Sequence, residues 1–269
     1  MRWRLAQVAV ACLAFLMLTA ALAAAQGEFR EFPEFRYTSG LPGGGWGVTP
    51  DGVPGFDGAM QLNVPVAYTP HRGVIAGFSV GSFDSTPRLE AGGAKSNGNA
   101  WIALGLGRPG HGLYLCEQPT ANNFEESVGE PVQNIQWQLM SETAGRPAAA
   151  FGVQDLFQNR SRYIGAPRDL HDTDSPYLVL TRHFGEERPV YVTLGWGWGR
   201  FNSTAIGGVS WRADDRVTVM AEYDGFNANL GAAFDLSPWL LEDTILFAGM
   251  VDLERTVIGM SYVYGDLNL

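Results

Sequence analysis

Residues 190–224 contain two consecutive stretches in which side chains alternate between two different faces. In VYVTLGWGWGRF, one face holds bulky apolar side chains, while the other holds glycine, threonine and tyrosine with little charge. The stretch VTVMAEYDG repeats the alternation after a short connection. A period of two indicates β-strands, because successive side chains point to opposite sides of the pleat. Strands that are apolar on one face and small or polar on the other are typical of a transmembrane β-barrel.

The same alternation recurs along the chain and predicts an all-β fold, an antiparallel transmembrane β-barrel with an even number of strands, 12–14. Thirteen stretches alternate, from AMQLNVPVAY at residues 59–68 to TVIGMSYVYGD near the end. Pro65 cannot donate a ladder hydrogen bond, so the first stretch would lie near a seam or a bulge. Because bacterial barrels have even strand numbers, either residues 35–48 supply one more strand or one stretch is not a strand. We favour fourteen strands.

The lengths of the connections agree with a barrel. Three long polar connections, at residues 84–98, 119–131 and 155–175, are separated by single short ones at 108–110 and 142–146. In an antiparallel barrel all three must therefore lie at the same end. Outer-membrane barrels place their long loops outside and their short turns on the periplasmic side.

The first 25 residues have the features of a secretory signal peptide. Arg2 and Arg4 precede an apolar run at residues 5–22, and three alanines follow it. The alternative is a retained membrane anchor. Cys12 lies inside the apolar run, so we expect no lipidation. The sequence therefore predicts export to the outer membrane of a Gram-negative-type bacterium, after cleavage near Ala25.

We expect three regions in the chain: the signal peptide at 1–25, an irregular N-terminal arm or partial first strand at 26–58, and an outer-membrane β-barrel at 59–269. The second region is dense in glycine and proline, which interrupt regular structure. No apolar run of about 18 residues follows the signal peptide, so we expect no transmembrane helix.

The net charge argues against nucleic-acid binding, and the cysteine content excludes an intrachain disulfide. The net charge is −10, and removal of the signal peptide would take away two more basic residues. The chain therefore lacks the basic face that nucleic-acid binding requires. Only Cys116 remains after cleavage, so no intrachain disulfide can form.

The alternation assigns residues to the two faces of the barrel wall. The amides of VQNIQWQLMS alternate with apolar residues, and because amides are costly to bury in a dry core, we expect them to face a wet lumen. The lumen-facing candidates are Asn134, Gln136, Gln138, Tyr191, Thr193, Arg212, Thr218 and Glu222. The lipid-facing candidates are Trp137, Leu194, Trp196, Trp198, Val217 and Val219.

Residues that could suggest catalysis have simpler structural interpretations. Asp224 begins an Asp-Gly hairpin turn, and Glu222 is expected to form an ion pair with Arg212 in the lumen. The Gly-Phe-Ser-Val-Gly match around Ser79 lies inside a strand, whereas a hydrolase elbow needs a strand-to-helix turn. The histidines lack metal-ligand spacing, and the acidic residues at 169–174 do not form an EF-hand. We expect no catalytic residues, no metal site and no cofactors.

The final strand partly matches the terminal signal that barrel-assembly machinery reads, through Gly259, Tyr262 and Tyr264. Residues 134–265 contain the stretches RPAAAFGVQDLF, TRHF, VTLGWGWG, GGVSW and AEYDGFNANLGAAF, and the earlier chain contains SGLPG and VTPDGVPGFDGAMQLNV. Through the first five stretches, and more loosely through the last two, the chain resembles the YjbH-like outer-membrane proteins, a family associated with exopolysaccharide. The resemblance implies an outer-membrane β-barrel connected with polysaccharide secretion.

From these features we expect a non-enzymatic outer-membrane barrel that is porin-like or accessory to exopolysaccharide export. The expected partners are outer-membrane lipid, the barrel-assembly machinery, and polysaccharide or its export components, with no nucleic acid. One alternative is an outer-membrane or periplasmic hydrolase of lipid or glycan. A further alternative is a soluble periplasmic carbohydrate-binding β-sandwich.

Overall fold

The computed structural model describes residues 40–82, 96–122, 132–157, 174–241 and 243–265. The predicted signal peptide and most of the predicted N-terminal arm lie outside these residues. No helix in the described part of the chain is long and apolar enough to cross a membrane.

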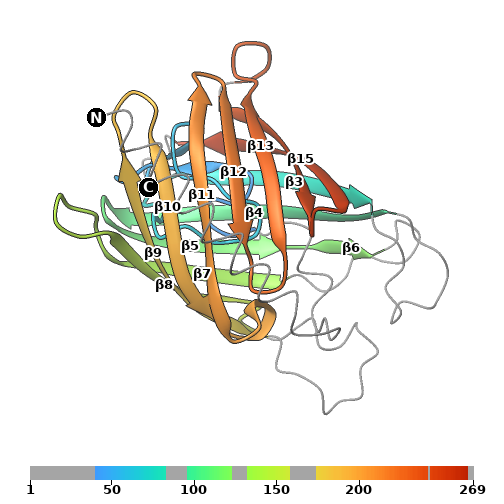
Figure 1. The fold of residues 1–269 in the computed structure, drawn as a ribbon, viewed down its shortest axis with the longest axis horizontal. Helices are drawn as coiled ribbons and strands as arrows, with labels where there is room; N and C mark the ends of the chain where they lie inside the picture. Colours follow the sequence, from blue (N-terminus) through green and yellow to red (C-terminus); the bar gives the residue numbers. More distant parts are fainter. Residues whose placement is uncertain (1–39, 83–95, 123–131, 158–173, 242, 266–269) are drawn as a thin grey trace.

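Twelve antiparallel strands form a closed barrel (Figure 1), which confirms the predicted all-β antiparallel barrel with an even strand number and excludes the β-sandwich. Neighbouring barrel strands in the sequence pair with each other, and β3 also pairs with β15, which closes the ring. The short β6 (Thr120–Asn122) extends the sheet and pairs only with β4. The barrel strands are β3 (Val74–Ser82), β4 (Ser96–Arg108), β5 (His111–Gln118), β7 (Val132–Met140), β8 (Ala148–Gln154), β9 (Ser175–Phe184), β10 (Val190–Gly197), β11 (Thr204–Asp214), β12 (Val217–Tyr223), β13 (Ala228–Asp235), β14 (Thr244–Val251) and β15 (Arg255–Tyr264).

The strand number is twelve, so the preference for fourteen is wrong. The predicted strand at residues 59–68 is not a strand, and the barrel begins at Val74 rather than at residue 59. This stretch makes only isolated bridges, such as the one between Val48 and Ala59, and Pro65 has no N–H to donate to a ladder. Residues 59–68 instead pass through the inside of the barrel.

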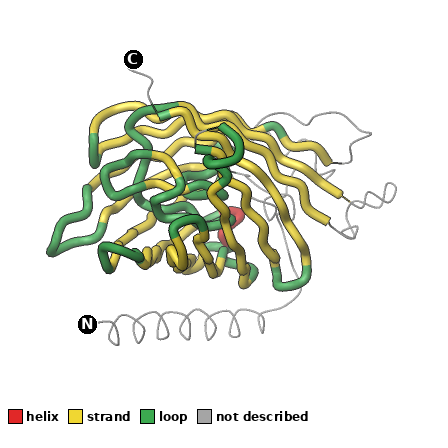
Figure 2. Tube along the Cα trace, turned by 90° about the horizontal axis from the view of Figure 1, so that it is seen from above, coloured by secondary structure: helices red, strands yellow, loops and turns green. Residues whose placement is uncertain are grey.

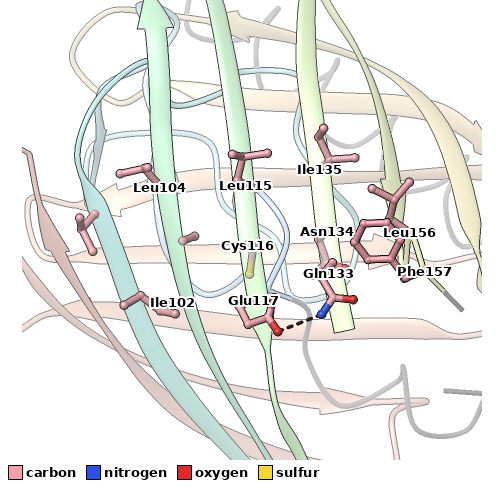
Figure 3. Close-up of a pocket in the computed structure, with 12 residues that line it drawn as sticks. Ile102, Leu104, Leu115, Cys116, Glu117, Gln133, Asn134, Ile135, Leu156 and Phe157 are labelled. Atoms are coloured by element: carbon pink, nitrogen blue, oxygen red, sulfur yellow. Dashed lines mark hydrogen bonds between the residues drawn. The ribbon is translucent and has the colours of Figure 1, made fainter. Parts of the chain in front are cut away.

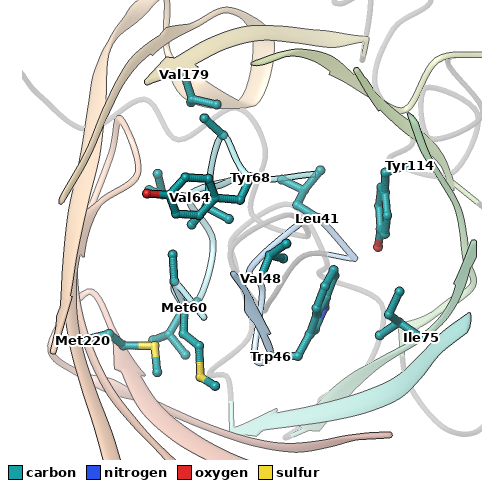
Figure 4. Packing of buried hydrophobic residues seen from close by; sticks show 14 of the residues in the cluster. Leu41, Trp46, Val48, Met60, Val64, Tyr68, Ile75, Tyr114, Val179 and Met220 are labelled. Carbon is teal, nitrogen blue, oxygen red and sulfur yellow. The ribbon is translucent and has the colours of Figure 1, made fainter. Parts of the chain in front are cut away.

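Residues 40–73, which we call the internal segment, fill the interior of the barrel before the chain enters β3. The segment is irregular apart from a small hairpin of β1 (Gly47–Val48) and β2 (Pro54–Gly55). Figure 2 shows its loops enclosed among the strands, and Figure 4 shows its side chains inside the ring that the wall forms. The hydrophobic core of the protein therefore consists of this segment and the inner face of the barrel.

The two ends of the barrel differ in their connections. Strands β3 and β8 both run toward one end, from which residues 83–95 and 158–173 continue, and residues 123–131 follow β6 at that same end. The strand order thus confirms that the three long connections share an end, which we call the long-loop end. The other end carries the turns between β9 and β10 and between β11 and β12, and we call it the short-turn end.

Candidate functional site

The interior of the barrel is occupied by apolar side chains of the internal segment. Trp46 stacks on Tyr114 of the wall, with ring centroids 5.9 Å apart. Glycines in the wall make room for the segment: a Cβ at Gly208 would collide with Gln61, and one at Gly249 would collide with Leu62. The fully buried apolar residues of the segment are Leu41, Trp46, Val48, Ala59, Met60, Leu62, Val64, Val66, Ala67 and Tyr68. On the small-residue face noted in residues 190–199, the room beside Gly195 and Gly197 is taken instead by Val179 and Phe201.

Amide side chains of β7 bind the backbone of the internal segment. The Nε2 of Gln136 donates to the carbonyl of Val66 at 3.0 Å and to Oγ1 of Thr69 at 2.6 Å. The Oε1 of Gln138 accepts from the amide of Thr69 at 3.0 Å. The Nδ2 of Asn134 donates to the carbonyl of Gly40 at 3.1 Å. These amides face the interior, where their partners are backbone groups and the Thr69 hydroxyl of the internal segment.

Hydroxyl groups on the neighbouring strands act in the same way. The Tyr191 hydroxyl donates to the carbonyl of Asp57 at 2.8 Å. Oγ1 of Thr181 accepts from the amide of Ala67 at 2.7 Å and shares a hydrogen bond with Thr193 at 2.9 Å. Because the segment is irregular, its amides and carbonyls need such partners once they are buried. Thr218 is also buried on the inner face.

Glu222 of β12 makes the densest set of contacts with the internal segment. Its carboxylate accepts hydrogen bonds from the amides of Leu62, Asn63 and Val64, at 2.9, 2.8 and 3.2 Å. The Nδ2 of Asn229 adds a fourth at 2.9 Å. Removing a carboxylate from water is costly unless hydrogen bonds replace its lost hydration. The three successive amide N–H groups provide these hydrogen bonds and direct the positive ends of their dipoles at the carboxylate.

The predicted ion pair between Arg212 and Glu222 is wrong. Arg212 lies near the short-turn end, where its Nη1 is 2.8 Å from Oδ1 of Asp57 in the internal segment. In the register of β11 and β12, Arg212 pairs with Thr218, whereas Glu222 pairs with Gly208. Four residues along a strand separate the two side chains by about 13 Å.

We expect the substitution Arg212→Met to change the free energy of unfolding by less than about 1 kcal/mol, because exposed ion pairs contribute little. The Asp57 side chain is 66% exposed, so water can replace the arginine. Urea unfolding of the detergent-solubilised barrel measures the effect, and a loss of several kcal/mol would show that this pair anchors the segment.

A second polar cluster, missed by sequence reasoning, lies where β7 and β9 reach the short-turn end. Tyr68 of the internal segment donates to Glu142, whose Oε2 is also 3.1 Å from Nδ1 of His183. Burial, together with the bond to Glu142, raises the pKa of Tyr68 well above its ordinary value, so the phenol stays protonated and donates. The buried Arg200 was also missed; it donates to the carbonyl of Asn63 at 3.0 Å.

The outer face of the barrel carries the residues predicted to contact lipid. Val217 is partly exposed. Trp198 lies just beyond β10, as the N-cap of the 3-10 helix Gly199–Phe201. The other candidates that are exposed at their strand positions are Trp137, Leu194, Trp196 and Val219.

In β15, Gly259 faces inward, where a side chain would collide with Phe247. The alternation of β15 puts Tyr262 and Tyr264 on the opposite, outer face. Their role as an assembly signal stays a prediction.

The residues considered for catalysis have structural roles. Asp224 accepts hydrogen bonds from the amides of Phe226 and Asn227, at 3.0 and 2.8 Å, and Gly225 has a φ of +98°. The predicted Asp-Gly turn is therefore correct. Ser79 is buried in the middle of β3, in no strand-to-helix turn. No group of three or more histidine, cysteine or acidic residues within the described residues could hold a metal ion, and most of the acidic loop at 169–174 lies outside them.

One comparison with known proteins finds a match. The family model YjbH, described as exopolysaccharide biosynthesis protein YbjH, matches residues 125–251, which include β7 to β14. A search of curated proteins finds no match. The family match covers most of the region in which the sequence resemblance was noted, so this part of the chain is similar to the YjbH family.

Proposed function

We propose that this protein is a non-enzymatic outer-membrane barrel that serves exopolysaccharide export as an accessory component with a closed lumen, rather than as an open porin. The family match supports the connection with exopolysaccharide. The internal segment supports the closed lumen, and it is the observation that carries the proposal. The protein would then act through its ends and its outer face.

The outer face supports insertion into a membrane. Water-soluble proteins seldom expose continuous apolar patches of more than a few hundred Å². Here exposed apolar side chains occur around the wall, with tryptophans near both ends, as in outer-membrane barrels. The exposed large apolar residues of the strands include Phe78, Ile102, Leu115, Trp137, Phe151, Leu178, Leu180, Leu194, Trp196, Trp211, Val219, Leu230, Phe234, Met250 and Ile258.

The energy of burial argues against an internal segment that leaves the lumen readily. Nine of its large apolar side chains are at most 6% exposed: Leu41, Trp46, Val48, Phe56, Met60, Leu62, Val64, Val66 and Tyr68. Burial of this many side chains is worth on the order of 15–25 kcal/mol, as an upper bound. Thermal motion alone would therefore open the lumen too rarely to support steady diffusion.

We expect the purified mature protein to insert into planar lipid bilayers without producing stepwise conductance, because the internal segment occupies the lumen. The measurement is single-channel recording, with an open porin as positive control and heat-modified gel mobility to verify that the barrel is folded. Regular ohmic conductance steps from the folded protein would contradict the closed lumen and favour an open porin. Recovery of the protein from cells in soluble form, without detergent, would contradict the membrane location.

A further inference from the structure

The outer face of the barrel has a groove of about 530 Å³ across β4, β5 and β7. Figure 3 shows Leu104, Leu115 and Ile135 on neighbouring strands, with Leu156 and Phe157 beside Ile135. These side chains form an apolar channel on the face that would meet lipid. The groove is separate from the internal segment, which occupies the other face of the same wall.

The rim of the groove is fixed by the way the chain leaves β8. Asp155 has a φ of +58°, and its amide donates to Oδ1 of Asn134 at 3.3 Å. The amide of Leu156 then donates to the carbonyl of Gln133 at 2.9 Å. These bonds fix the backbone just before Phe157, which lines the groove and is 67% exposed. Hydrogen bonds to β7 therefore fix the backbone that forms the rim of the groove.

One end of the groove is polar. Nε2 of Gln133 donates to Oε1 of Glu117 at 2.9 Å (Figure 3), and both side chains point outward. The neighbouring outward-facing residues of the groove are apolar: Ile102, Leu104, Leu115 and Ile135. Within the described residues, no basic side chain forms an ion pair with Glu117. A carboxylate at the edge of a membrane-facing apolar surface is costly unless a cation or water compensates it.

We infer that the groove binds a membrane amphiphile whose acyl chain lies along the apolar channel and whose primary ammonium group donates to Glu117. This inference rests on the proposed membrane location. An ammonium group has three donors and a full positive charge, so it matches a carboxylate that already accepts one bond from an amide. A choline headgroup has the charge but no N–H, and a phosphoglycerol headgroup is anionic and would be repelled.

The test uses the folded mature protein, exchanged into nanodiscs that contain equal amounts of ethanolamine, choline and glycerol phospholipids of identical acyl chains. Native mass spectrometry after mild delipidation then counts the lipids that stay bound. We expect retention of the ethanolamine lipid over the glycerol lipid by about tenfold, the value of one charge-assisted hydrogen bond. The choline lipid should fall between them.

Two variants separate the headgroup contact from the groove. Glu117→Gln keeps the shape and should remove the ethanolamine preference. Phe157→Ala should weaken retention of all three lipids and leave their order unchanged. Glu187→Gln, in the exposed turn between β9 and β10, is the matched control and should behave as the parent protein.

Equal retention of the three lipids, or a preference that survives Glu117→Gln, would overturn the inference while leaving the proposed function intact. A protein that does not enter nanodiscs, and that stays soluble without detergent, would instead overturn the proposed function and this inference with it.

Discussion

The substitution Glu222→Gln is expected to lower the free energy of unfolding by about 3–5 kcal/mol, because more than one buried donor would lose its acceptor. The carboxylate accepts three successive amides of the internal segment and one side-chain amide. Glutamine has a single acceptor oxygen, and its NH₂ group would face some of these donors. Buried donors that lose their acceptor cost about 1–3 kcal/mol each.

Urea unfolding of the barrel in detergent, followed by tryptophan fluorescence, measures this effect. The matched control is Glu187→Gln, which removes an exposed carboxylate at a turn and should change stability by less than about 0.5 kcal/mol. If the two variants unfold at the same urea concentration, Glu222 does not hold the internal segment. The comparison remains informative when Glu222→Gln folds poorly, because the yield of folded barrel can be compared with that of the control.

The substitution Gly58→Ala is expected to destabilise the protein by at least about 3 kcal/mol, through overpacking and lost hydrogen bonds. A Cβ at this position would collide with the backbone C, N and O atoms of Val48. Backbone cannot move aside as a flexible side chain can. Val48 and residues 58–59 would have to separate, which breaks the two backbone bonds between Val48 and Ala59, at 2.9 and 3.2 Å.

The control for this variant is Gly145→Ala, in the turn between β7 and β8. A Cβ at Gly145 would have no atom within 4 Å, and its φ is not positive. We expect the control to unfold within about 0.5 kcal/mol of the parent protein. Equal stability of Gly58→Ala and Gly145→Ala would mean that the backbones at Gly58 and Val48 are not in close contact.

Much of the barrel wall could be predicted because a half-buried strand has a strict period of two. In β10 the alternation correctly separates the buried Tyr191 and Thr193 from the exposed Leu194 and Trp196. The Asp-Gly turn was predictable for a similar local reason, because it needs positive φ at Gly225. These features depend on neighbouring residues only.

The contents of the lumen could not be predicted because they depend on contacts between distant residues. Residues 59–68 alternate in hydrophobicity like a strand, yet side chains of both parities are buried, including Gln61 and Leu62. Alternation alone does not distinguish a wall strand from a chain enclosed on every side. Pro65 and the odd count of thirteen stretches were the signals that one assignment was wrong. The contact of Arg212 with Asp57 could not be predicted either, because it depends on the register of β11 and on the path of the internal segment.

The internal segment comes first in the described chain, and the ring around it is closed by β3 and β15, the first and last strands of the barrel. Its bonds to the wall span long stretches of sequence: the amide of Met60 meets Ser210, 150 residues away, and the carbonyl of Gly45 meets Ser261, 216 residues away. A segment with so many bulky side chains cannot thread into a ring that is already complete. We therefore expect the wall to assemble around its contents, in a slow process dominated by distant contacts, and the pairing of β3 with β15 to complete the ring.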